Sequence, residues 1–180
     1  MNHFRIFAPR SAWPFAFALA FACAPALAKD AGAPAVHVDW SDPATLSEVR
    51  EDTCRSRTRP GEWLGQLARY LQRRAGSRLA AGQQLAITIT DIRRAGACEP
   101  WRGPQMDDVR VIKNLYPPRI DLRYTLSAAD GSVVRSGEAR LRDNAFLSRG
   151  TMSRDDPLRY EKRMLDDWLR RTFPPGAADD

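Results

Sequence analysis

Hydrophobic and polar residues alternate in several stretches of the chain, with the period of two that is typical of half-buried strands. Val36, Val38 and Trp40 alternate with polar neighbours, and the apolar residues between positions 85 and 92 do the same. β-Branched residues, which favour strands, are frequent in both stretches. A loop with glycine and proline breaks follows, and then a shorter strand is expected at residues 109–111. The pattern therefore predicts two strands and a shorter third one.

Residues 120–141 contain the clearest supersecondary pattern. Apolar residues alternate on both sides of the turn sequence Asp130-Gly131, which is typical of a β-hairpin. The register that keeps the apolar positions of both strands on one side pairs Leu122 with Ala139. In this register the other facing pairs are Asp121 with Arg140, Arg123 with Glu138, and Tyr124 with Gly137. The two charged pairs would be exposed cross-strand ion pairs.

Two further stretches have the 3.6-residue period of amphipathic helices. The first is expected at residues 60–79, and the second begins after Asp156-Pro157 and ends before Pro174-Pro175-Gly176. The apolar stripes consist of Trp63, Leu64, Leu67, Tyr70, Leu71 and Ala75 in the first helix, and of Leu158, Met164, Leu165, Trp168, Leu169 and Phe173 in the second. Strands and helices do not alternate strictly, so the expected class is α+β: a mainly antiparallel sheet of about four strands with two amphipathic helices packed on one face.

The N-terminal residues have the organisation of a secretory signal peptide. Two arginines precede an apolar stretch at residues 13–24, and Ala26-Leu27-Ala28 provides a small-x-small cleavage pattern. Cleavage is favoured over an N-terminal anchor because prolines interrupt this apolar stretch, which is short for a membrane span. Lipoprotein anchoring at Cys23 is disfavoured because the usual leucine three positions earlier is absent. We therefore expect residues 1–28 to be removed and the mature protein to reside in the periplasm.

Composition supports one folded domain after this segment. The chain has 180 residues, of which 43% are hydrophobic and 28% charged, as in a single globular domain. We expect a flexible leader at 29–35, a single α+β domain at 36–173 and a disordered tail at 174–180. The mean hydropathy of −0.47 and the lack of a long apolar stretch beyond the signal peptide exclude a transmembrane helix in the mature chain.

Charge and motif content exclude several functions. The net charge of +6 comes mainly from arginines, many of which fall on solvent-facing helix positions. Basic and aromatic residues do not interleave in a stacking pattern, so nucleic acid is not an expected partner. With two histidines, three scattered cysteines and no nucleotide-binding motif, neither a metal nor another cofactor is expected. An envelope protein or an anionic envelope surface is the expected partner.

Catalytic material is limited to carboxylates. His37 is the one histidine of the expected mature chain and lies in a strand near its terminus, which argues against a nucleophilic triad. Asp91 and Asp143 each end a strand without an assigned cation. Asp91 has the same parity as Leu85, Ile87 and Ile89, which places it at the end of the buried face. It either caps the following loop, the favoured alternative, or binds a cation or ligand there.

These observations favour a non-enzymatic envelope domain that binds or supports a partner; the alternative is a carboxylate-dependent hydrolase acting on an envelope polymer. A metal between Asp91 and Asp143 would favour the hydrolase. An exposed groove lined by arginine and aromatic side chains would favour the binder. Together with Asp91 and Asp143, Trp101 and Arg119 are the candidate functional residues.

Four segments together resemble one bacterial family. They are Val38-Asp39-Trp40 with Pro43, LAITITDIRRAG at 85–96, RVIKNLYPPRIDLRYTL at 110–126 and YEKRMLDDW at 160–168. In order and spacing the chain resembles the family named domain of unknown function 3016, over residues 36–173. The resemblance implies an exported protein and no particular reaction. Acidic or apolar residues often follow the Asp91-Ile92 pair in this family, so the Arg93-Arg94 of this chain argues against a cation site there.

The two cysteines after the signal peptide, Cys54 and Cys98, lie in the loops that flank the first helix and the second strand. Export would bring them into an oxidising compartment, so we expect them to form a disulfide. They are not part of the family pattern, which suggests that they arose together as a local cross-link.

Overall fold

The computed structural model of the protein describes residues 35–54, 59–149 and 155–174. The predicted signal peptide lies outside the described residues, as do nearly all of the predicted leader and C-terminal tail. The described residues form strands and helices in the order that the sequence pattern predicts, with short additional helices at the loops.

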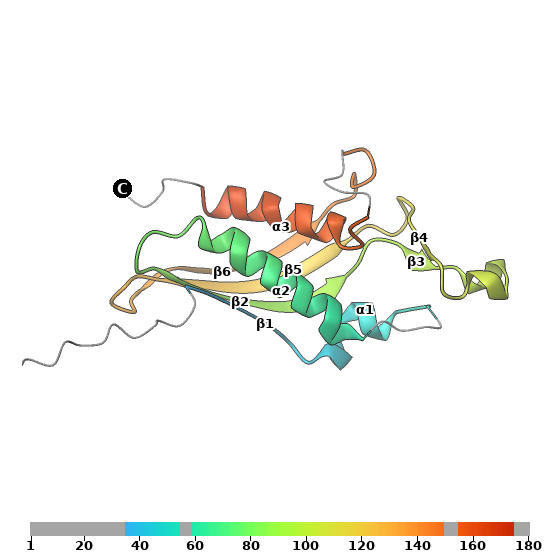
Figure 1. Ribbon diagram of the computed structural model, residues 1–180, viewed down its shortest axis with the longest axis horizontal. Coiled ribbons are helices and arrows are strands. Elements are labelled where there is room, and N and C mark those ends of the chain that lie inside the picture. Colours follow the sequence, from blue (N-terminus) through green and yellow to red (C-terminus); the bar gives the residue numbers. More distant parts are fainter. Residues whose placement is uncertain (1–34, 55–58, 150–154, 175–180) are drawn as a thin grey trace, which may run out of the picture. The chain divides into compact units, whose positions relative to one another are not determined.

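A four-stranded sheet forms the centre of the domain (Figure 1). Its order is β1 (Val36–Trp40), β2 (Gln84–Arg93), β5 (Arg119–Ser127) and β6 (Val133–Arg142). β2 pairs with β5 and β5 with β6 in antiparallel fashion, whereas β1 runs parallel to β2. The α+β class is therefore confirmed, and the sheet is mixed because a helical crossover carries the chain from β1 back to the start of β2.

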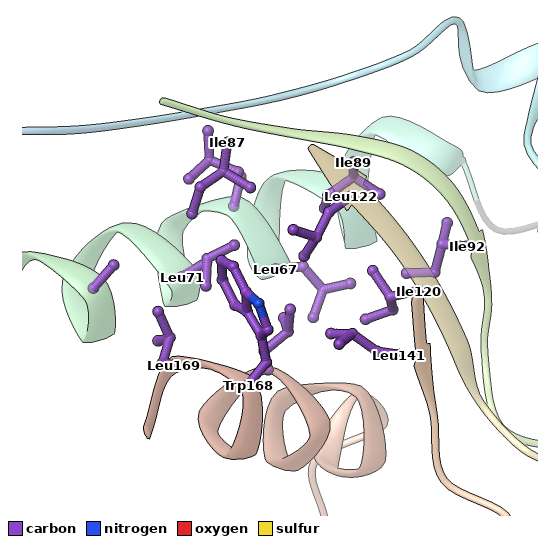
Figure 2. Packing of buried hydrophobic residues seen from close by; sticks show 14 of the residues in the cluster. Leu67, Leu71, Ile87, Ile89, Ile92, Ile120, Leu122, Leu141, Trp168 and Leu169 are labelled. Carbon is purple, nitrogen blue, oxygen red and sulfur yellow. The ribbon is translucent and has the colours of Figure 1, made fainter. Parts of the chain in front are cut away.

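Two helices cover one face of this sheet. α2 (Pro60–Gly76) ends three residues earlier than predicted, and α3 (Arg159–Thr172) ends before Pro174 as expected. Their apolar stripes are buried against the apolar side chains of all four strands. Figure 2 shows Trp168 of α3 pointing into the core beside Leu67 and Leu71 of α2. The opposite face of the sheet, called the outer face below, carries polar side chains.

The β5–β6 hairpin has the predicted register over nearly its whole length, with Leu122 opposite Ala139. Arg123 forms the predicted ion pair with Glu138, with 3.1 Å between Nε and Oε1. Asp121 faces Arg140, as expected, but its carboxylate pairs with Arg142 at 2.6 Å instead. The prediction of an Asp121–Arg140 ion pair is wrong. The long side chain of Arg142, which is two positions further along β6, reaches diagonally to Asp121 on the adjacent strand.

The aromatic ring of Tyr124 covers Gly137, as the register predicts. A Cβ at position 137 would lie 3.1 Å from the Tyr124 hydroxyl oxygen, so the ring occupies the space that a side chain would need. The same ring makes edge contacts with Trp168 and Phe173, each at a centroid distance of 5.6 Å. The glycine therefore allows the hairpin to pack closely against α3.

A β-bulge in β2 changes which residues face the core near its end. The pairing with β5 shifts between Ile89 and Asp91, and the buried side chain beyond the shift is Ile92. Asp91 lies opposite Asp121, whose two neighbours in β5 are both buried, so Asp91 belongs to the outer face. The expectation that Asp91 ends the buried face is wrong because the bulge inserts one residue and reverses the alternation.

Between β2 and β5 the chain forms an arm, defined here as residues 94–118, which leaves the sheet at the end of β2 and returns at the start of β5 (Figure 1). It contains a small antiparallel pair, β3 (Ala97–Cys98) and β4 (Arg110–Val111), and the latter corresponds to the predicted short strand. Two 3-10 helices, η2 (Pro100–Arg102) and η3 (Pro104–Met106), connect these strands.

The segment that follows β1 contacts the base of the arm. It contains the 3-10 helix η1 (Pro43–Thr45) and the short helix α1 (Ser47–Arg50). Cys54, which follows α1, forms the predicted disulfide with Cys98 in β3, with 5.0 Å between their Cα atoms. The bridge joins two segments that are 44 positions apart in the sequence.

Candidate functional site

Three arginines form a row across three neighbouring strands. Arg93 in β2 lies opposite Arg119 in β5, which lies opposite Arg142 in β6. Residues in the adjacent row, Ile92, Ile120 and Leu141, are buried, so the three arginines point to the outer face. Neighbouring strands are about 4.8 Å apart, which brings three positive charges close together. We call these residues the arginine row.

Like charges directly opposite one another in a sheet are unfavourable, so the arginine row needs nearby acids. Glu51, which follows α1, accepts a hydrogen bond from Arg93 at 2.5 Å and lies 3.9 Å from the guanidinium of Arg119. Asp121 pairs with Arg142. Two carboxylates thus pair with three guanidinium groups, and Glu51 itself is half exposed. A third carboxylate, Asp91, lies on the same face opposite Asp121 but is hydrogen-bonded to Ser47 rather than to an arginine of the row.

A groove lies beside this row, where the arm returns to the sheet. It has a volume of about 390 Å³ and is lined by Arg93, Arg119 and the arm residues Leu115, Tyr116 and Pro117. Leu115 is 74% exposed, so its aliphatic side chain is available at the surface beside the two arginines. The groove therefore combines guanidinium groups, which bind carboxylate or phosphate, with an apolar and aromatic wall.

The wall of this groove is held from behind by a buried carboxylate. The Tyr116 hydroxyl donates a hydrogen bond to Glu99 at 3.0 Å, and Glu99 also accepts from Lys113 at 2.6 Å. The hydrogen bond from Lys113 lowers the pKa of Glu99 and keeps it ionised. Loss of solvent contact and the bond to Glu99 raise the pKa of Tyr116, so its hydroxyl remains a donor. The backbone of Tyr116 is fixed as well, since its carbonyl accepts from Gly96 at 3.0 Å.

Gly96 is required where the arm begins. Its φ of 81° lies in the left-handed region, and a Cβ there would be 2.8 Å from the carbonyl oxygen of Val111. A side chain would therefore separate the two ends of the arm, one of which carries the groove residues.

An ion-pair network also fixes the base of the arm. The buried carboxylate of Glu48 in α1 accepts hydrogen bonds from the backbone and Nε of Arg94, at 2.8 and 2.7 Å, and from Arg110 at 2.6 Å. Nearby, the Thr53 hydroxyl donates to the Cys98 carbonyl at 2.6 Å, beside the disulfide. Because buried ions without partners are costly, this network strongly favours one position of the arm's base against α1.

Glu161 in α3 is buried completely beneath the same region. One carboxylate oxygen accepts from the Ala95 backbone at 2.7 Å, and the other has no hydrogen-bond partner among the described residues. Burial raises the pKa of Glu161. Glu161 is not among the candidates from the sequence, although its spacing from Leu158, Leu165 and Trp168 places it on the apolar stripe of the helix.

The candidate residues from the sequence do not form one site. Asp91 accepts from the backbone and hydroxyl of Ser47, at 2.7 and 2.8 Å, so it caps the start of α1 rather than the loop that follows β2. Asp143 follows β6 and faces α3, where Arg163 lies 3.2 Å away. Arg119 belongs to the arginine row, and Trp101 is 70% exposed on η2 of the arm.

His37 is exposed on β1, the edge strand that pairs with β2. Within 35–54, 59–149 and 155–174, no three His, Cys, Asp or Glu side chains are placed to hold a metal ion. Arg119 is a candidate site residue from the sequence, whereas Arg93 and Arg142 are not, because the alignment of the row depends on the pairing of distant strands.

The fold and this site define a small α+β domain with a row of arginines on its outer face and an anchored arm. The chain belongs to a family described as protein of unknown function (DUF3016), whose model matches residues 34–171. The resemblance inferred from the sequence segments is therefore confirmed. No curated protein and no solved structure matches the chain.

Proposed function

We propose that the protein is a non-enzymatic binding domain of the cell envelope, and that its groove binds a partner protein which presents an acidic group beside an apolar side chain. The observation that carries this proposal is the groove itself, in which Arg93 and Arg119 adjoin the exposed Leu115 and the ring of Tyr116. Trp101 and Val109 of the same arm are exposed as well, outside the groove lining.

Rigidity of the arm supports this function. The disulfide, the Glu48 network and the Glu99 cluster hold the groove wall before any partner arrives. A preformed surface loses less conformational entropy on binding than a flexible one, so the same contacts give higher affinity.

The compartment is proposed on separate grounds. The N-terminal signal pattern and the Cys54–Cys98 disulfide both support the periplasm, because disulfides persist in oxidising compartments. None of the helices among the described residues is long and apolar enough to span a membrane.

Binding is preferred to the hydrolase alternative because of where the carboxylates lie. Asp91 is on the outer face, and its carboxylate accepts hydrogen bonds from Ser47. Asp143 instead faces α3 on the other side of the sheet and is paired with Arg163. A two-carboxylate mechanism needs both groups at one reacting centre.

Photocrosslinking in cells tests the proposal. A photoreactive phenylalanine analogue replaces Leu115 in one protein and Val133 in another, since both side chains are well exposed but Val133 lies at the start of β6, outside the groove. We expect a discrete adduct from position 115 that is absent from position 133 and is lost when Arg93 and Arg119 are changed to Gln. An absent adduct, or the same adduct from both positions, would contradict the proposal.

A further inference from the structure

A second pocket lies at the open edge of the sheet, where β6 passes α3. It has a volume of about 450 Å³, within the range of small-molecule sites. Arg140 and Arg142 of β6 form one wall, and Arg171 of α3 and Arg149 of the connecting loop contribute to the others. The pocket does not include Leu115 or Tyr116, so it is separate from the groove at the arm.

The acids of this pocket are already neutralised by arginines. Asp143 is paired with Arg163 at 3.2 Å and lies 3.7 Å from Arg149. Asp167 is paired with Arg149 at 2.7 Å and also with Arg170. Neither carboxylate therefore has a full negative charge left for the remaining arginines of the pocket.

Arg140 and Arg171 have no ion-pair or hydrogen-bond partner for their side chains among the described residues. Arg140 faces Asp121, but that carboxylate is taken by Arg142. Asp121 and the two acids of the pocket are thus paired with four arginines, Arg142, Arg149, Arg163 and Arg170, and no carboxylate among the described residues is paired with Arg140 or Arg171. The uncompensated positive charge is thus concentrated at a concave surface, where it attracts anions most strongly.

We infer that this pocket binds a phosphoryl group, with Arg140 and Arg171 as its principal ligands and Arg142 and Arg149 beside them. Guanidinium groups bind phosphate through paired, charge-assisted hydrogen bonds, and a phosphoryl group supplies the two or more acceptor oxygens that such an arrangement can bind. The phosphoryl group can belong to a lipid headgroup or to a soluble phosphate compound. This inference does not depend on the proposed function of the groove.

Two double variants test the inference with matched loss of charge. The pocket variant is Arg140→Gln with Arg171→Gln, which breaks no ion pair of the described residues. The control variant is Arg69→Gln with Arg73→Gln, on the exposed face of α2 and away from the pocket. Calorimetric titration with inorganic pyrophosphate forms one arm of the test. Sedimentation with vesicles of phosphatidylglycerol in phosphatidylcholine forms the other, compared with phosphatidylcholine alone.

The expected result is binding in at least one arm that falls at least tenfold in the pocket variant and less than threefold in the control variant. Binding of pyrophosphate with this pattern indicates a soluble phosphate ligand, and binding only of the anionic vesicles indicates a lipid headgroup. Equal losses in both variants would show general attraction by net charge and overturn the inference. Failure of the wild-type protein to bind either probe would overturn it as well.

Discussion

Replacing both Cys54 and Cys98 with serine should lower the free energy of unfolding by about 4 kcal/mol. The two residues are 44 positions apart, and the bridge closes a loop of that length in the unfolded chain. In the chain-entropy relation such a closure removes roughly 13 cal/mol/K from the unfolded state, or about 4 kcal/mol at 25 °C. The native ion-pair network around Glu48 is independent of the bridge, so the arm should keep its place in the folded variant.

Urea unfolding followed by the fluorescence of the buried Trp63 and Trp168 measures this loss. Both proteins begin after Ala28, the expected cleavage site, so that Cys23 is absent and cannot form mixed disulfides. Wild-type protein treated with a reductant should match the serine variant, and the reductant should not change the variant. The slope of the transition should also increase, because an uncross-linked chain exposes more surface when it unfolds. A loss below about 1 kcal/mol would refute the assignment of this stabilisation to the unfolded state.

Four further substitutions have defined outcomes. Tyr70→Phe removes a 2.7 Å hydrogen bond to the buried Asp166, so it should cost about 2 kcal/mol in urea unfolding, whereas an unchanged midpoint would contradict this contact. The pKa of Tyr70, raised to about 12 mainly by burial and also by that bond, should return towards 10 in Asp166→Asn, as followed by ultraviolet titration. Gly96→Ala places a side chain at positive φ against the backbone of Val111, so it should cost at least about 1 kcal/mol and increase hydrogen exchange in the arm more than in the core. Glu161→Gln should remove a pH dependence of the free energy of unfolding. Because the folded-state pKa of Glu161 is raised above 4.5, the wild type should lose stability relative to the variant as pH rises from that value. Parallel curves of stability against pH for the two proteins would exclude this effect.

The hairpin was predictable because its information is local. Asp130-Gly131 specifies the turn, and the alternation on each side then leaves one register that buries the apolar positions of both strands. The apolar stripes of α2 and α3 were predictable for a similar reason, since helical periodicity depends on residues only three or four positions apart. The turn sequence, the alternation along the strands and the periodicity of the helices were consistent with one another, so the fold class and the hairpin register could both be predicted from them.

The arginine row was not predictable in the same way. Arg93 and Arg119 become neighbours only through the pairing of β2 with β5, and the bulge before Asp91 shifts that pairing by one residue. A bulge depends on the partner strand and on packing, neither of which alternation along one strand reports. Glu161 was overlooked for another reason: a carboxylate on an apolar stripe contradicts the usual pattern of burial, and its role depends on the Ala95 backbone, 66 positions away.

The parallel pairing of β1 with β2 affects the order in which the sheet can form. Val36 faces Leu85, 49 positions later, whereas Ser127 faces Val133 across the hairpin, only six positions later. Closing the longer loop costs about 2 kcal/mol more chain entropy, so we expect the β5–β6 hairpin to form early and β1 to join the sheet last. Until it does, the edge of β2 presents unpaired backbone groups. This edge is therefore the place where two incompletely folded copies would first associate.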